Sequence, residues 1–220
     1  RYEFHLVVQK LQTFCSEQLG GFYLDILKDR LYTAGEKSTA RRSAQNALYH
    51  ITHSLARLMA PVLSFTAEEV WETLSGSQEE SIFQNAWHTL PDVPGAETLL
   101  REWDVISAWR ARANKQIEDV RAAGQIGQSL AAELDIYAAA DFELLNRLGD
   151  DLRFVMITSR ASVHRVATAA EEKIVVIPSS HPKCERCWHY RADVGSNTEH
   201  PQICGRCVSN LFGSGEKRSH

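Results

Sequence analysis

Residues 184–187 read Cys-Glu-Arg-Cys, and residues 204–207 read Cys-Gly-Arg-Cys, with sixteen residues between the two pairs. Each Cys-x-x-Cys pair can form a tight turn that offers two thiolates to one ion, so this spacing predicts a tetrahedral four-cysteine site. Four sulfur ligands favour zinc, with a single iron as the chemical rival. Two disulfides or four unrelated buried thiols are the alternatives. They are disfavoured because four of the five cysteines of the chain fall within 24 residues.

The segment around these cysteines is poor in large apolar side chains. Residues 181–212 hold only seven of them, too few to offset the conformational entropy of so small a unit. A structural zinc supplies about 10–16 kcal/mol of apparent binding energy, which becomes folding energy. We therefore predict one structural zinc in a ribbon spanning 181–212. Its ligands would be Cys184, Cys187, Cys204 and Cys207, which leaves no open position for a catalytic water.

The composition of the chain bounds its environment. The formal net charge is -4 and the apolar share is 44%. The sequence contains no run of 18 apolar residues, which is the length that a membrane-spanning helix needs. No signal peptide is visible, and metal-binding thiols suit a reducing compartment, so we expect a cytoplasmic protein. The chain opens without Met, in the middle of a helical pattern, as a piece of a longer protein would. Because the net charge is negative, any binding of a nucleic acid must come from placed side chains.

The N-terminal part has a helical period. Gly20-Gly21 is expected to stop or kink the first helix, Ser38 or Thr39 to cap the third, and Thr66 to open a capping box for the fourth. Cys15 lies on an apolar face and is expected to be a small core residue rather than a fifth ligand. The four apolar patterns predict helices over residues 4–19, 22–32, 39–60 and 66–74, and short links between them indicate a helical bundle over 1–90.

A change of pattern follows the break at residues 91–95. A long helix over 99–120 should end at Gly124 and Gly127. Beyond it the sequence predicts a helix over 141–148 and short strands over 130–137, 152–157, 163–166 and 174–177. The expected fold is therefore mainly α: a helical bundle (1–90), a small α+β connector (96–178) and the four-cysteine ribbon (181–212).

No catalytic motif occurs in the chain, which favours a binding module over a catalyst. His50 and His53 are three residues apart on a helix, but no carboxylate or third histidine accompanies them, so we interpret them as a partly solvated face. Near the first cysteine pair, Trp188 and neighbouring aromatic residues alternate with arginines such as Arg186. Such residues suit stacking on unpaired bases, although Trp188 could equally pack the ribbon against its neighbour.

Two stretches of the bundle carry a resemblance to a known family. Residues 22–33 (FYLDILKDRLYT) and 60–71 (APVLSFTAEEVW) resemble the anticodon-binding domain of class I aminoacyl-tRNA synthetases. Residues 183–188 and 203–208, which carry the cysteine pairs, are similar to the zinc-binding C-terminus of bacterial isoleucyl-tRNA synthetases. The bundle alone would not separate the isoleucyl enzymes from their relatives. The order of bundle, connector and terminal ribbon is what points to them.

The resemblance implies a function for the chain. Full-length relatives join isoleucine to its tRNA through an aminoacyl-adenylate, using ATP and Mg²⁺ in a catalytic domain whose H-I-G-H and K-M-S-K-S sequences do not occur here. This chain, which also lacks the editing domain, should be inactive alone. It should be a monomer that grips the anticodon stem-loop of isoleucine tRNA. From charge and placement, the expected tRNA contacts are Lys28, Arg30, Lys37, Arg42, Arg186, Trp188 and Arg206.

Three rival interpretations remain open at this point. A DNA-repair glycosylase can end in a similar four-cysteine finger, but a long amphipathic bundle ahead of the finger fits it poorly. A rubredoxin-like electron carrier would hold iron in place of zinc and would be coloured. Lastly, the ribbon could seal the fold and touch no RNA.

Overall fold

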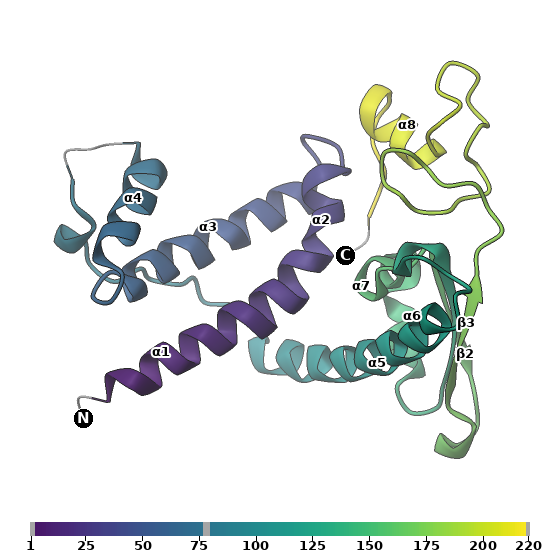
Figure 1. The fold of residues 1–220 in the computed structure, drawn as a ribbon, viewed down its shortest axis with the longest axis horizontal. Coiled ribbons are helices and arrows are strands. Elements are labelled where there is room, and N and C mark those ends of the chain that lie inside the picture. Colours follow the sequence, from purple (N-terminus) through teal and green to yellow (C-terminus); the bar gives the residue numbers. More distant parts are fainter. Residues whose placement is uncertain (1–2, 77–79, 219–220) are drawn as a thin grey trace.

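The computed structural model describes residues 3–76 and 80–218 of the chain. Figure 1 shows an arm of helices, a helix-covered sheet, and a ribbon that ends beside the inner end of the arm. The arm holds α1 (Phe4–Thr13), α2 (Leu24–Tyr32), α3 (Thr39–Met59) and α4 (Ser64–Ser75), and the later helices are α5 (Ala96–Ala122), α6 (Phe142–Arg147), α7 (Leu152–Met156) and α8 (Gly205–Phe212). The strands are β1 (Ala132–Ala138), β2 (Arg160–Arg165) and β3 (Lys173–Pro178). The fold is mainly α with a small sheet, as the sequence predicts.

The first two helices form one continuous rod. Between α1 and α2, residues Phe14–Tyr23 continue the helix as a π-helix, so Gly20-Gly21 does not stop it. A Cβ atom at Gly20 would lie 2.9 Å from the carbonyl oxygen of Cys15, which is closer than real Cβ contacts. The glycine pair is therefore needed by the close backbone packing within this widened turn.

The next two helices test the expected caps. Ser38 caps α3, because its hydroxyl accepts a hydrogen bond from the backbone N–H of Arg41 at 3.3 Å. The capping box at Thr66 is wrong: α4 begins at Ser64, and its N-cap residue Leu63 makes no side-chain cap. Trp71 of α4 is 5% exposed and packs with Ala56 and Ala60 at the end of α3. These contacts hold the outer end of the arm together.

The connector is built on a three-stranded sheet in the order β2-β1-β3. The central strand β1 pairs parallel to β2 and antiparallel to β3. Side chains of β1 pack with those of α5 in the largest core of the molecule, which includes Trp109, Ala113, Ile117, Leu134 and Ile136. Three of the four predicted strand segments overlap observed strands, and the helix predicted over 141–148 contains α6.

The strand predicted over 152–157 is wrong, because Leu152–Met156 forms the helix α7. All five residues of α7 are buried. A short run that is buried on every side shows no period that separates a helix from a strand. The helix ends at Ile157, whose φ of 54° places it in the left-handed region.

Arginines from later segments tie the three parts of the molecule together. Arg110 of α5 is buried and donates hydrogen bonds to the carbonyl oxygens of Val155 and Gly21 and to the carboxylate of Asp25. Arg110 thus fixes the connector against the rod. Its burial lowers its pKa, and the charge of Asp25 opposes that shift.

The ribbon is fixed to α2 by a buried carboxylate. Arg206 Nη1 and Nη2 donate to the two oxygens of Asp29 at 2.9 and 2.7 Å, and Arg218 pairs with the same carboxylate. The side chains of Asp29 and Arg206 are each 11% exposed. Burial by itself would raise the pKa of Asp29. Hydrogen bonds from Arg206 and the charges of both arginines outweigh that effect and hold its pKa well below the usual range.

No helix in the described ranges 3–76 and 80–218 is both long enough and apolar enough to cross a membrane.

We predict that Asp29→Ala lowers the unfolding free energy by up to about 3–5 kcal/mol, because it removes the nearer carboxylate of two buried guanidinium groups and leaves them to share Glu216. Urea unfolding of the zinc-loaded protein measures this change. As a control, Arg121→Ala removes an exposed pair with Glu118 and should cost less than about 1 kcal/mol. Equal costs for the two variants would show that the buried pair does not hold the ribbon.

The same carboxylate predicts a pH dependence. The pKa of Asp29 is lower in the folded protein than in the unfolded chain, so its stabilisation is full above about pH 4 and is lost as the pH falls further. The unfolding free energy of the wild type should therefore fall more steeply below about pH 4 than that of Asp29→Ala. Parallel acid titrations of the two proteins would contradict this expectation.

Candidate metal centre and nucleic-acid interface

Four sulfur atoms meet inside the ribbon. The Sγ atoms of Cys184 and Cys207 are 3.8 Å apart, as are those of Cys187 and Cys204. All four lie within 4.8 Å of one another and are buried. Among the described residues, this is the one group of three or more His, Cys, Asp or Glu ligands that meets this criterion.

These distances fit a metal centre and exclude disulfides. A disulfide joins its sulfur atoms at about 2.05 Å. Ligands at about 2.3 Å from a tetrahedral zinc form edges of about 3.8 Å, which is the observed separation of both pairs. The predicted ligand set therefore has the geometry of a structural zinc site. Cys15, at the start of the π-helix, lies outside the group and is half-buried.

Local backbone geometry aims the four sulfur atoms at one point. In the first turn, the backbone N–H of Trp188 donates to the carbonyl of Cys184, and the N–H of Cys184 donates to the carbonyl of His189, each at 2.9 Å. In the second, Cys204 is the N-cap residue of α8 and Cys207 lies in its first turn. The N-terminal end of a helix favours thiolates, because the backbone N–H groups there carry partial positive charge.

The thiols influence one another strongly. Hydrogen bonds from Cys204 and Cys207 lower the pKa of Cys187 well below its ordinary value, and the charge of Arg206 acts in the same direction. The bond to Cys187 raises the pKa of Cys204 to about 11 and also raises that of Cys207. Four ionised sulfur atoms at this distance require a cation between them, and a bound Zn²⁺ would supply that charge.

The first cysteine turn borders a cavity at the junction with α2. The ring of Trp188 is 57% exposed, its backbone is left-handed (φ 65°), and the Nζ atom of Lys183 lies 5.2 Å from its centroid. A cavity of 550 Å³ opens beside it, lined by Tyr32 and Lys28 of α2 among others. Tyr32 is 73% exposed. Two exposed aromatic rings beside two lysines form a surface suited to nucleic acid.

The comparisons with known proteins decide the family. Residues 1–136 match the family model of the anticodon-binding domain of tRNA ligases. The chain belongs to this family. Residues 182–210 match a second model, a zinc finger found in FPG and IleRS, which agrees with the four-sulfur geometry.

Curated relatives of this anticodon-binding chain match along its whole length. It is 60% identical over 220 residues to an isoleucine–tRNA ligase of Paraburkholderia phymatum. The matched region is 100% of this chain and 23% of that relative. The ligases of Nitrosomonas europaea (60% identical, 99% of this chain, 24% of the relative) and Bordetella parapertussis (56%, 100% and 24%) are also similar. This chain spans about a quarter of the length of the curated relatives that it matches.

Four of the seven expected tRNA contacts lie on the surface of this anticodon-binding chain. Lys28 is exposed on α2 and pairs with Asp25 at 2.8 Å. Lys37 is exposed in the loop before α3, Arg42 is exposed on α3, and Trp188 borders the cavity. Their contact with tRNA stays a prediction.

The other three arginines lie at internal junctions. Arg206 is engaged by Asp29, and Arg186 donates to the carbonyl oxygens of Thr33 and Tyr32 at 2.7 and 3.2 Å. Arg30 lines a second cavity between α2 and α5. The sequence shows the charge of these side chains but not their direction.

The interpretation of His50 and His53 as a partly solvated face is wrong for His53, which is 8% exposed. The segment after α4 brings a third histidine, His88, against them. No local spacing could have shown this, because His88 is 38 residues from His50 along the chain. Lys183 and Tyr32 were not among the predicted tRNA contacts, although both lie within the stretches that carry the family resemblance.

We predict one zinc per chain. Elemental analysis of reduced, unchelated protein should give about one zinc equivalent, and Cys204→Ser should lose it because one of the four ligands is removed. Cys15→Ser is the matched control and should keep its zinc. A stoichiometry near zero, or visible absorption from iron, would contradict the assignment.

We further predict that removal of the metal unfolds the ribbon and leaves the bundle folded. The ribbon core holds few apolar side chains besides the four cysteines, whereas α3 and α4 share their own core. After chelation, amide exchange should lose protection in 181–212 alone. Lost protection along 44–62 would show that the two parts do not fold independently.

Proposed function

We propose that this chain is the anticodon-arm recognition module of an isoleucine–tRNA ligase. The family match assigns an anticodon-binding domain, and the relatives that match the whole chain are isoleucine–tRNA ligases. In this proposal the partner is the anticodon stem-loop of isoleucine tRNA, in the cytoplasm, and the chain acts as a monomer. Attachment of isoleucine, with its need for ATP and Mg²⁺, belongs to the remaining length of such a ligase, and this chain alone is inactive.

The observation that carries the proposal is the exposed junction between α2 and the first cysteine turn. Trp188 and Tyr32 present open aromatic faces there, with Lys183 and Lys28 beside them. Unpaired bases of an RNA loop stack on such rings, and neighbouring lysines meet the phosphates.

We assign the predicted contacts two different roles. Lys28, Lys37, Arg42 and Trp188 contact RNA directly, because their side chains lie on the surface. Arg186 and Arg206 position the ribbon against α2, since their guanidinium groups bond to α2 and to the residue that follows it. Arg30 is also proposed as an RNA contact, and the grounds for this are its charge and its position on α2.

The alternatives are less well supported. The zinc-finger model also covers FPG, the DNA glycosylase type of finger, but the bundle ahead of the finger matches tRNA ligases. An iron-based electron carrier is not favoured by the match to a zinc finger.

The test is a titration of a labelled isoleucine anticodon stem-loop at several salt concentrations. Trp188→Ala should weaken binding by about 1–3 kcal/mol, the usual worth of one stacked base. Arg42→Ala should weaken binding. It should also reduce the slope of log affinity against log salt concentration by about 1, the value for one lost phosphate contact.

Trp188→Phe is the matched control, because it keeps an aromatic face and should bind nearly as the wild type does. Zinc content is measured for each variant. If Trp188→Ala keeps its zinc and binds unchanged, the ring only packs. Absence of binding by the wild type at low salt would overturn the proposed function for the isolated chain.

A further inference from the structure

Three histidines from two separate segments meet on α3. The Nδ1 atom of His50 and the Nε2 atom of His88 are 2.9 Å apart, so one ring donates a hydrogen bond to the other. The rings of His53 and His88 stack with centroids 5.4 Å apart, and the ring of Tyr49 covers His53 at 4.2 Å. Tyr49 itself is 53% exposed. We call His50, His53, Arg57 and His88 the histidine cluster.

The arginine of the histidine cluster has no acidic partner among residues 3–76 and 80–218. Arg57 Nη1 donates to the carbonyl oxygen of His53 at 2.9 Å and lies 3.1 Å from its Nδ1 atom, and the guanidinium lies over the ring of Trp71. The Nε atom of Arg57 and the Oγ atom of Ser54 are buried and have no hydrogen-bond partner in the described part of the chain. Buried donors without partners are rare and call for an explanation, such as a ligand.

The described elements packed around the histidine cluster place no carboxylate against it. Within the described residues, no carboxylate oxygen lies within 4.0 Å of a charged nitrogen of any of its four side chains. The α4 helix presents Trp71 to it, while the carboxylate of Glu68 on α4 instead accepts hydrogen bonds from Ser81 and Ile82. The segment after α4 contributes His88, and α3 contributes Tyr49 and the other three members. The cluster is therefore a group of titratable and cationic nitrogens that lacks an anion.

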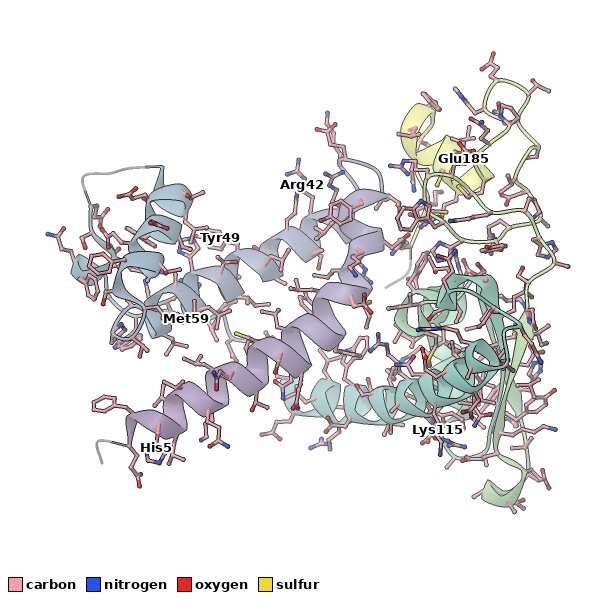
Figure 2. All side chains as sticks on the ribbon, in the orientation of Figure 1. His5, Arg42, Tyr49, Met59, Lys115 and Glu185 are labelled. Atoms are coloured by element: carbon pink, nitrogen blue, oxygen red, sulfur yellow. The ribbon has the colours of Figure 1, made fainter. Side chains whose placement is uncertain are left out.

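The position of the histidine cluster relates it to the ribbon. With 3.6 residues per turn, Arg42, Tyr49 and His53 fall on one face of α3. Figure 2 shows Arg42 and Tyr49 on the same edge of this helix, with Met59 on the other edge and Glu185 of the ribbon beyond its first turn. The eight residues from Arg42 to His50 span about 12 Å along the axis. The face of α3 that carries Arg42 near the ribbon therefore also carries Tyr49 and His53 at the cluster.

We propose that the histidine cluster binds a phosphodiester group of the RNA, as a second contact beyond the junction at Trp188. This proposal rests on the proposed function for the identity of the RNA. The exposed Tyr49 ring offers an adjacent face for a base or a ribose. A bound phosphate would supply the anion that the cluster lacks and an acceptor for its unpartnered donors.

The protonation of the cluster links binding to pH. Burial lowers the pKa of His53, and Arg57, His88 and His50 lower it further; burial and His50 likewise lower the pKa of His88. In the free cluster, His53 and His88 are therefore harder to protonate than ordinary histidines. A bound phosphodiester stays anionic and would raise these pKa values again, so binding takes up protons. Affinity for the RNA should consequently rise as the pH falls from 8.0 toward 6.2.

The experiment measures the affinity of the labelled anticodon stem-loop at pH 8.0 and 6.2 with zinc content checked at both. The wild type should bind about 3–10-fold more tightly at pH 6.2, because one proton taken up changes affinity by as much as tenfold per pH unit. His50→Gln combined with His88→Gln should bind equally at both pH values. His5→Gln, which removes an exposed histidine near the start of α1, is the matched control and should keep the wild-type pH dependence.

A second measurement follows the histidine Cε1 protons of the wild type by NMR during titration with inorganic phosphate. Phosphate should raise the pKa values of His53 and His88, and Arg57→Gln should abolish that rise. The cluster site is overturned if the wild type binds RNA equally at both pH values, or if the double variant keeps the wild-type pH dependence. The proposed function stands in both cases. If the wild type binds no RNA, the proposed function fails, and the phosphate titration alone decides whether the cluster is an anion site.

Discussion

The arrangement of this molecule depends on one buried carboxylate, that of Asp29. It accepts hydrogen bonds from both terminal nitrogens of Arg206 and forms an ion pair with Arg218. A single side chain of α2 therefore fixes both the ribbon and the segment after α8. Buried charges of this kind are stable only when they are fully paired. The position of Trp188 against α2, and therefore the proposed RNA surface, follows from this contact together with the hydrogen bonds of Arg186 to Thr33 and Tyr32.

The same principle operates at the second junction. Arg110 reaches back from α5 to the π-helix and α2, as Arg206 reaches back from α8. The rod formed by α1, the π-helix and α2 is thus the element to which both later parts attach. Its own α1 has no buried residue, so the rod is held near α2, both by these polar contacts and by the apolar contacts of Phe22, Ile26 and Leu27.

Periodicity and spacing in the sequence were sufficient for the long helices, for the approximate places of the three strands and for the four-cysteine site, because these patterns are local in the chain. The short buried helix α7 could not be distinguished from a strand, since all of its faces are buried. The site was only partly predictable for a related reason. Arg42 and Arg206 look alike in the sequence, and only Asp29, which is distant along the chain, separates a surface arginine from a buried one. His88 likewise joins the histidine cluster only through the fold.

The separation of Asp29 and Arg206 along the chain sets an order of events during synthesis. The two residues are 177 positions apart. At about 5–20 residues per second, a ribosome needs about 10–35 s to add Arg206 after Asp29, and the N-terminal helices fold first. The carboxylate of Asp29 must therefore remain hydrated until Arg206 has been added. The ribbon emerges after the helices to which it attaches, so closure of this junction, and any capture of a metal ion by its four cysteines, follows the folding of α2.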